Sequence, residues 1–316
     1  MRRRRFLTVA ALAGAGTTIG GCSVASTVRA PTPPAPSFVP FSIELGPVRV
    51  TALRTGAVAV KAAHREYGGP SFLRLPSIVC DPRWTPWLPV TCWLIEHPER
   101  LIVVDTGETA RTAEPDYFAC DPGTAFVYER LLRFDVAADR EVGPQLRALG
   151  IPPEEVRTVV LTHLHSDHAG GLAHFPNAQF MLSRTEAAQP AQGALPCRWP
   201  AFFTPQPIDY NDGAFGAFTA SYALTSDGLI RAVATPGHTR GHQSVLIGYE
   251  DEWALLAGDA SFSLDQVQRR AVAGICEDPN AARRTLATIA EHVDQFETRY
   301  LAAHDPAAET QSEQPE

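Results

Sequence analysis

Three histidines and one aspartate lie within six positions of this chain, directly after the apolar run 159–161, and this cluster constrains the fold more than any other feature. Its members are His163, His165, Asp167 and His168. Side chains alternate along a strand, so His163 and His165 would share one side, and the following turn would bring the other two to a neighbouring point. Imidazole and carboxylate groups suit zinc and related metals. The spacing predicts a centre for two metal ions, and therefore a hydrolase.

Four residues cannot complete two coordination spheres, so further ligands must come from later in the chain. His238, Asp259 and His304 are the candidates, because each follows a strand-like apolar segment. Proline and glycine at 236–237 force a turn that can present His238. A carboxylate can bridge two metals, which a neutral imidazole does not, so Asp259 is the candidate bridge.

In this order, the seven residues resemble the ligand set of the metallo-β-lactamase-fold hydrolases, and the resemblance extends from about Phe41 to Asp305. It implies an α/β fold, a metallo-β-lactamase-like αββα sandwich with two sheets flanked by helices. It also implies two divalent metal ions, with zinc as the expected metal. One ion is assigned to His163, His165 and His238, the other to Asp167, His168 and His304, and Asp259 bridges them.

Within that superfamily, the chain is most similar to the N-acyl-homoserine lactonases, which open the lactone ring of bacterial quorum-sensing signals. The similar stretches are 88–95, 104–107, 183–186, 236–244 and 304–305. The resemblance implies a small-molecule ester or lactone substrate, attacked by a metal-bridging hydroxide, with Asp167 as the proton carrier. No side chain needs to be acylated, so Ser166 is expected to shape the turn and not to act as a nucleophile.

One position departs from the lactonase pattern. Those enzymes have a tyrosine three residues after the bridging aspartate, and this chain has Phe262. Phenylalanine cannot donate a hydrogen bond, and the loss of one such donor typically costs about 3 kcal/mol in the transition state. Four tyrosines are candidate replacements, and the sequence alone does not place them: Tyr67, Tyr117, Tyr128 and Tyr222.

Two alternative functions stay open at this point. The secreted arylester and organophosphate triester hydrolases of the same fold have a region similar to 48–58. The second alternative is a metal-containing binding protein with little turnover, which only Phe262 suggests. The complete set of seven ligands favours turnover.

Other residues are expected to support the ligands. A ligating histidine usually donates its second N–H to a carboxylate or carbonyl. Asp105, which follows the apolar run 101–104, is the candidate acceptor, with an ordinary turn as the alternative. His242 is interpreted as a capped turn histidine, with a supporting role as the alternative. His64, His97, His174 and His292 have no partner pattern and are interpreted as surface or core residues.

The N-terminal region predicts export. Four arginines at 2–5 precede a short, mildly apolar segment, so residues 1–21 are interpreted as a twin-arginine-like signal of the lipoprotein type, with Cys22 as the lipidated residue. Residues 22–40 are proline-rich and form a tether, and residues 41–316 form the hydrolase domain. The protein is expected in the periplasm or cell envelope, anchored to the membrane by lipid alone. Removal of residues 1–21 changes the formal net charge from −8 to −12, which argues against nucleic-acid partners.

Cysteine pairing stays open in the sequence. Five cysteines remain beyond Cys22, so at least one is unpaired. Cys80 with Cys120 is one candidate disulfide, and Cys92 is expected in the core. The other two are Cys197 and Cys276.

The order of elements agrees with two packed sheets. Helices are expected near 141–149 and 279–295. Strands are expected at 42–53, 90–96, 101–105, 158–162, 178–183, 229–234, 244–249, 253–257 and 299–303. The remaining segments 64–89, 108–140 and 188–227 carry aromatic residues that either line a substrate pocket or form a core beneath long loops.

Overall fold

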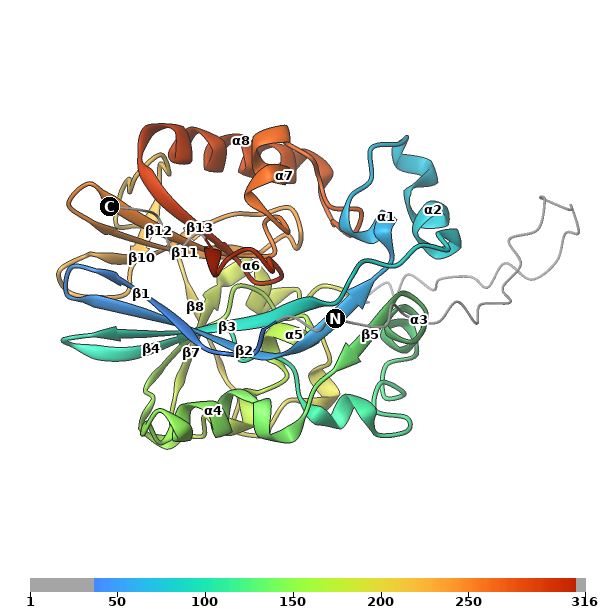
Figure 1. The fold of residues 1–316 in the computed structure, drawn as a ribbon, viewed down its shortest axis with the longest axis horizontal. Helices are drawn as coiled ribbons and strands as arrows, with labels where there is room; N and C mark the ends of the chain where they lie inside the picture. Colours follow the sequence, from blue (N-terminus) through green and yellow to red (C-terminus); the bar gives the residue numbers. More distant parts are fainter. Residues whose placement is uncertain (1–36, 311–316) are drawn as a thin grey trace, which may run out of the picture.

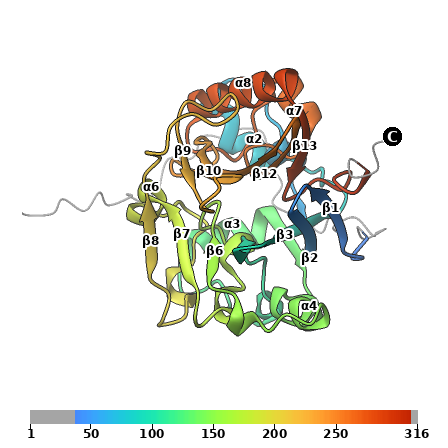
Figure 2. The same ribbon diagram turned by 90° about the vertical axis from the view of Figure 1, so that its left-hand side faces the viewer.

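Two β-sheets face each other in the computed structural model, which describes residues 37–310 (Figures 1 and 2). The first sheet has the order β1 (Phe41–Leu45), β2 (Val48–Val60), β3 (Leu88–His97), β4 (Arg100–Val104), β6 (Thr158–Val160), β7 (Gln179–Ser183) and β8 (Pro205–Ile208), and β5 (Leu132–Asp135) pairs with β2. The second sheet has the order β13 (Glu297–Ala302), β12 (Glu252–Gly258), β11 (Gln243–Tyr249), β10 (Ile230–Ala234) and β9 (Ser221–Ala223).

The main apolar core lies between the sheets. Ile43, Val50 and Val160 of the first sheet pack in one cluster with Val245 and Leu256 of the second. Period-two alternation directs these side chains inward. Each is at most 4% exposed, so these side chains are shielded from solvent between the sheets.

Helices cover both outer faces (Figure 1). α4 (Val142–Ala148) lies on the first sheet, and α7 (Leu264–Arg269) and α8 (Pro279–Gln295) lie on the second. The order helix, sheet, sheet, helix confirms the predicted αββα sandwich. The remaining helices are α1 (Ala62–Arg65), α2 (Arg74–Cys80), α3 (Pro122–Leu131), α5 (Ser166–Ala169) and α6 (Arg184–Ala188).

Helix α8 has the boundaries that its sequence predicts. Asp278 caps its N-terminus by accepting hydrogen bonds from the N–H groups of Asn280 and Ala281, and Pro279 occupies the first helical position. Leu286 and Ile289 are buried against the second sheet. The apolar stripe therefore belongs to the core, as expected from its three- and four-residue spacing.

The strand predictions differ from the structure in two respects. The segment 42–53 is not one strand but the antiparallel pair β1 and β2, because Gly46 turns the chain with φ +53°. A side chain at Gly46 would collide with the ring of Tyr249. β2 also continues to Val60, where it pairs with β5. The sequence analysis missed β5, β8 and β9, which are at most four residues long.

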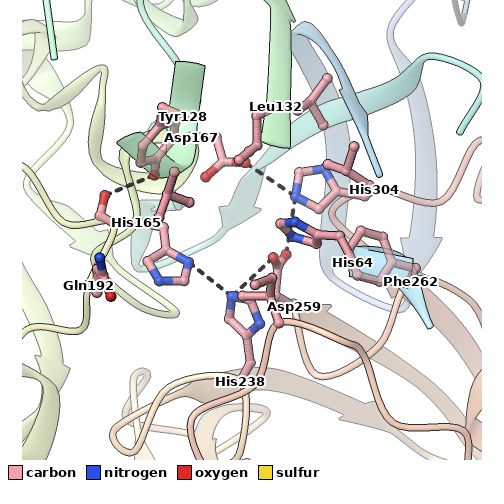
Figure 3. Close-up of a pocket in the computed structure, with 15 residues that line it drawn as sticks. His64, Tyr128, Leu132, His165, Asp167, Gln192, His238, Asp259, Phe262 and His304 are labelled. Atoms are coloured by element: carbon pink, nitrogen blue, oxygen red, sulfur yellow. Dashed lines mark hydrogen bonds and ion pairs between the residues drawn. The ribbon is translucent and has the colours of Figure 1, made fainter. Parts of the chain in front are cut away.

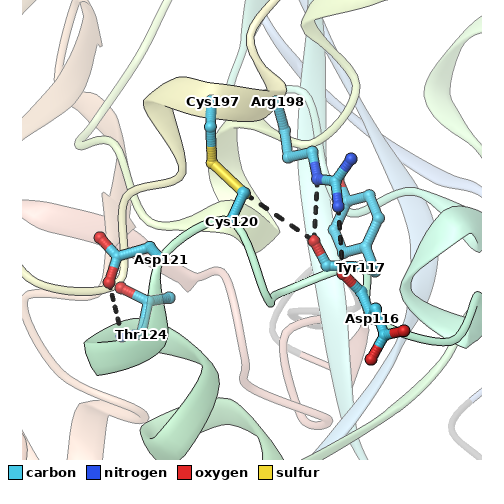
Figure 4. The surroundings of a disulfide bond; sticks show 7 residues. All are labelled: Asp116, Tyr117, Cys120, Asp121, Thr124, Cys197 and Arg198. Carbon is cyan, nitrogen blue, oxygen red and sulfur yellow. Dashed lines mark hydrogen bonds between the residues drawn. A yellow bond between two sulfur atoms is a disulfide. The ribbon is translucent and has the colours of Figure 1, made fainter.

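The predicted disulfide between Cys80 and Cys120 is wrong. Cys120 pairs with Cys197, with 6.3 Å between the Cα atoms (Figure 4). The bond ties the segment before α3 to the chain at 196–198, where Arg198 Nε donates to the carbonyl of Tyr117 at 2.8 Å. Cys92 is buried and free, as expected, and so is Cys276. The spacing of cysteines could not predict this pairing, because it depends on how two long connections cross.

The proposed export signal, the lipid site at Cys22 and most of the tether lie outside the described residues, so they stay predictions. Within residues 37–310, no helix is long and apolar enough to cross a membrane.

Candidate metal centre

All seven predicted ligands lie at one edge of the two sheets, where four strands end. His163 and His165 follow β6, and Asp167 and His168 lie in the single-turn helix α5. The second sheet supplies the others: His238 after β10, Asp259 after β12 and His304 after β13. All seven side chains are buried or nearly so, and the groups that face one another come from both sheets.

The first cluster consists of three imidazoles. His165 Nδ1 lies 3.0 Å from Nε2 of His163 and 3.0 Å from Nε2 of His238. Burial lowers the pKa of all three, so the rings are neutral near pH 7. Neutral imidazoles with converging nitrogens are the form that binds a metal.

The second cluster contains Asp167, His168 and His304. Nε2 of His304 lies 3.4 Å from Asp167 Oδ2, and Nε2 of His168 lies 3.9 Å from Asp167 Oδ1. Burial opposes the charged form of His304, but the carboxylates of Asp259 and Asp167 outweigh it and raise the pKa of His304 to about 10. The cluster thus has an excess of negative charge, which retains protons on its histidines and which a cation would balance.

Asp259 lies between the two clusters (Figure 3). Its Oδ2 is 3.4 Å from His238 Nε2, and its Oδ1 is 3.2 Å from His168 Nε2 and 3.3 Å from His304 Nε2. Asp259 Oδ1 and His168 Nε2 have no hydrogen-bond partner although both are buried. Buried polar atoms without partners are costly, and a bound cation would satisfy both. The residues present therefore fit two divalent ions, with one carboxylate shared.

Asp105 supports the second cluster. Its Oδ2 accepts a hydrogen bond from His168 Nδ1 at 2.8 Å, which directs His168 Nε2 towards Asp259. Asp105 also accepts hydrogen bonds from the N–H and the hydroxyl of Thr162, at 2.7 and 2.8 Å. The structure thus places Asp105 as the carboxylate partner of the predicted ligand His168, and the contact confirms the pairing that the sequence analysis expected.

His242 has a more specific position than an ordinary turn residue. Its Nε2 accepts the backbone N–H of Asp259 at 3.0 Å, and its Nδ1 lies 2.8 Å from the hydroxyl of Thr235. Since Nε2 accepts, the ring proton is on Nδ1. His242 therefore positions the shared carboxylate through the backbone.

Glu186 joins two of the ligand loops. Its Oε1 accepts the N–H of Leu164 at 3.1 Å, and its Oε2 accepts the hydroxyl of Thr239 at 2.6 Å. Leu164 lies between His163 and His165, and Thr239 follows His238. The sequence analysis assigned Glu186 no role, although the similar stretch 183–186 was the signal that could have found it.

Ser166 is held by a buried carboxyl group. Its hydroxyl lies 2.5 Å from Oε2 of Glu108, which also accepts the N–H of Thr109 through Oε1. Burial raises the pKa of Glu108 to about 8. The Ser166 hydroxyl is thus engaged with Glu108, which agrees with a structural role for this serine.

A cavity opens above the two clusters (Figure 3). Its floor is formed by His165, Asp167, His238, Asp259 and His304. Apolar side chains make up most of its wall: Val58, Val60, Val127, Leu132, Phe262 and Ile275. The loop phenylalanines and tryptophans that the sequence offered either as pocket residues or as a core beneath long loops do not line this cavity. Phe118, Trp199 and Phe203 pack instead against the cores, whereas Phe72 and Phe126 are exposed.

Tyr128 is the one candidate tyrosine that lines this cavity, and its hydroxyl is engaged. It donates to the carbonyl of Gly193 at 2.8 Å and accepts the N–H of Ser166 at 3.3 Å. The other three candidates, Tyr67, Tyr117 and Tyr222, are absent from the cavity wall.

His64 is the cavity residue that the sequence analysis missed. It was interpreted as a surface or core histidine, but it lines the cavity beside Phe262 (Figure 3). No sequence signal marks it, since no other predicted ligand lies within forty residues. The other three histidines agree with the interpretation: His97 pairs with Asp227, His174 pairs with Glu141, and His292 is buried among aromatic rings.

Comparison with known proteins agrees with this geometry. The sequence profile described as the metallo-beta-lactamase superfamily matches residues 85–301. The chain belongs to this superfamily. Among metallo-beta-lactamase relatives, the N-acyl homoserine lactonase AttM of Rhizobium johnstonii is 30% identical over 235 residues, which cover 70% of this chain and 83% of the relative.

Solved metallo-beta-lactamase structures share the fold. An N-acyl homoserine lactone hydrolase with N-hexanoyl-L-homoserine at its metal centre superposes with a TM-score of 0.66 and 22% identity, covering 84% of this chain and 94% of that one. The dizinc quorum-quenching lactonase AidC superposes with a TM-score of 0.59 and 16% identity, covering 84% and 90%. The chain is a metal-dependent hydrolase of this superfamily.

Proposed function

We propose that this protein hydrolyses the lactone ring of N-acyl homoserine lactones with two bound zinc ions. The observation that carries the proposal is the position of Asp259, whose two carboxylate oxygens face two separate ligand clusters at the floor of an apolar cavity. The AttM relative, most of whose length aligns with this chain, is named for that reaction.

The seven residues divide into two ligand sets. His163, His165 and His238 would hold one ion, Asp167, His168 and His304 the other, and Asp259 would contact both. Two such ions supply a water molecule that is acidic near neutral pH and a positive charge that polarises the lactone carbonyl.

The chain itself must handle one proton. Hydrolysis adds the oxygen of water to the carbonyl carbon, breaks the bond from that carbon to the ring oxygen, and leaves a carboxylate and an alcohol. The ring oxygen needs a proton as it departs. Asp167 lines the cavity and would carry that proton from the attacking water to the leaving oxygen.

The apolar wall suits an acyl chain. Val58, Val60 and Leu132 lie on one side of the cavity, and Val127 and Ile275 also line it. Each buried methylene of a bound acyl chain contributes about 0.8 kcal/mol. Longer acyl chains should therefore bind more tightly than shorter ones until the wall is filled.

The test is hydrolysis of a series of acyl homoserine lactones, measured in a pH-stat as the release of protons. The protein is measured as purified, after removal of metal with a chelator, and after zinc is restored. An aryl phosphotriester is measured in parallel. We expect lactone opening that is lost on chelation and returns with zinc.

Other results would change the proposal in different ways. Turnover of the phosphotriester alone would replace the lactone with a triester as substrate. An absence of turnover on both substrates by protein with two bound ions would rule out this substrate class. Lactone opening that resists chelation would exclude a role for the metals.

A further inference from the structure

The imidazole of His64 lies in the cavity wall, and its buried nitrogen makes no hydrogen bond that would support the fold. The residue lies in α1 and is 7% exposed. Its Nδ1 is buried and has no hydrogen-bond partner. Figure 3 shows the ring beside Phe262, near the carboxylate of Asp259 and the ring of His304. A buried polar group without a partner is costly, so its retention at a reaction site indicates a ligand.

The backbone of His64 is held firmly. Its carbonyl accepts the N–H groups of Gly274 at 2.8 Å and Ile275 at 3.2 Å, and its own N–H donates to the carbonyl of Lys61 at 2.9 Å. A β-carbon at Gly274 would collide with the carbonyl oxygen of Ala63. The glycine therefore permits the close approach that fixes α1, and with it the imidazole, at the edge of the cavity.

Phe262 orients the ring from the side. The two rings meet nearly edge to face, with centroids 6.5 Å apart and an interplanar angle of 83°. Phe262 in turn stacks on His304, with centroids 5.6 Å apart. The orientation of the histidine ring is thus fixed by aromatic packing, which uses no hydrogen bond from its nitrogen atoms.

The remaining polar wall offers no equivalent donor. The hydroxyl of Tyr128 already donates its hydrogen bond to the carbonyl of Gly193, and the side chain of Phe262 has no polar atom. Gln192 is exposed. Among the wall residues above the ligands, His64 is the buried side chain that retains a free polar ring atom.

We propose that His64 is a catalytic residue that donates an N–H hydrogen bond to the substrate oxygen on which negative charge develops as the ester bond opens. The proposal rests on the proposed hydrolysis of a lactone or ester. A neutral imidazole has one N–H and can make this bond without transferring its proton. A preorganised donor acts more strongly in a water-poor, apolar cavity than in water.

Two substitutions separate the donor from the ring. His64→Gln keeps an N–H donor, and His64→Phe keeps a ring of similar volume but has no donor. We expect His64→Phe to lower kcat about 100-fold to 1,000-fold, with KM changed much less. We expect His64→Gln to keep most of the wild-type kcat. Metal content should stay at two ions in both variants.

His292→Phe is the matched control. His292 is also buried, and its Nε2 also has no partner, but it lies in α8 and packs among Phe218, Trp253 and Phe296, outside the cavity. This substitution should leave kcat within about twofold of the wild type. The control separates loss of a buried imidazole from loss of this imidazole.

A second readout does not depend on turnover. The ring-opened product, N-hexanoyl homoserine, has a carboxylate that can accept the same hydrogen bond, and its affinity is measured by calorimetry. We expect weaker product binding in His64→Phe than in His64→Gln. Equal kcat and equal product affinity in these two variants, at unchanged metal content, would overturn the role of His64.

The proposed substrate and the role of His64 fail in different ways. If the wild type opens no acyl homoserine lactone, the lactone proposal fails, and the same variants are compared on p-nitrophenyl acetate, which any ester hydrolase of this kind should cleave. If the wild type opens lactones and His64→Phe does so at the same rate, only the role of His64 fails.

Discussion

The Oδ2 atom of Asp105 accepts a hydrogen bond from His168 Nδ1 at 2.8 Å, and both side chains are at most 2% exposed. Asp105 has φ +61°, so it holds the carboxylate from a left-handed turn at the end of β4. The turn thus presents the carboxylate beneath the metal centre, where it determines which nitrogen of His168 faces Asp259.

Substitution Asp105→Asn should weaken metal binding. Asparagine tolerates the left-handed backbone, but its amide replaces an acceptor oxygen with a donor, while His168 and Thr162 both donate to this side chain. We expect affinity to fall about 10-fold to 100-fold, measured by competition with a chelator of known affinity.

The control for this prediction is Asp227→Asn. Asp227 pairs with His97 at 2.8 Å in a similar aspartate–histidine contact, and neither residue lines the cavity. Metal affinity should not change in this variant. An equal loss of affinity in both variants would contradict the role assigned to Asp105.

The metal count should depend on which ligand is removed. His238 belongs to one cluster, whereas Asp259 faces both. Elemental analysis after dialysis should find two ions per wild-type chain, about one in His238→Ala, and fewer than one in Asp259→Ala. His97→Ala, outside the clusters, should keep two ions. Loss of both ions from His238→Ala, to the extent seen in Asp259→Ala, would argue against two separable sites.

The disulfide between Cys120 and Cys197 should stabilise the wall of the cavity. The bond joins residues 77 positions apart, and α3, which carries Val127 and Tyr128, begins directly after it. Removal of a native disulfide typically costs about 2–4 kcal/mol of unfolding free energy. Cys120→Ala, Cys197→Ala and the double variant should lose the same amount in urea unfolding, because each breaks the same bond. Additive losses would mean that the thiol sites pack independently.

The contribution of Glu108 to the stability of the metal-free protein should fall between about pH 4.5 and pH 8. Burial raises the pKa of Glu108 from an ordinary 4.5 to about 8, so the folded chain retains a proton that the unfolded chain releases over this window. The stabilising contribution of this carboxyl group must therefore decrease as the pH rises through the window. Glu108→Gln has no proton to lose there, so the unfolding free energy of the wild type should fall relative to that of the variant as the pH rises.

The comparison uses urea titrations of chelated protein at pH 5, 6, 7 and 8. Glu129→Gln, which changes an exposed carboxylate, should follow the wild type at every pH. A Glu108→Gln variant with the same pH dependence as the wild type would contradict the assignment of this proton to Glu108.

The sequence by itself determined the seven candidate ligands and the position of most of the longer strands. His163, His165, Asp167 and His168 are neighbours in the chain, so they could be recognised as one cluster, although β6 ends at Val160, before the first of them. His238, Asp259 and His304 could be found because each follows an apolar segment, and strands of a layered α/β fold end at a common edge. The helix 279–295 was predicted from the three- and four-residue spacing of its apolar residues, whereas its cap at Asp278 was identified only in the structure.

Only the tertiary structure decided the rest, because those features depend on contacts between segments far apart in the chain. Cys120 meets Cys197 because two long connections cross beside α3. His64 reaches the cavity because α1 docks on Gly274 and Ile275, some 210 positions later. Local patterns record which face of an element is apolar, but they do not record which distant polar group that face is packed beside. The predicted metal ligands could therefore be found in the sequence, and the residues of the cavity wall could not.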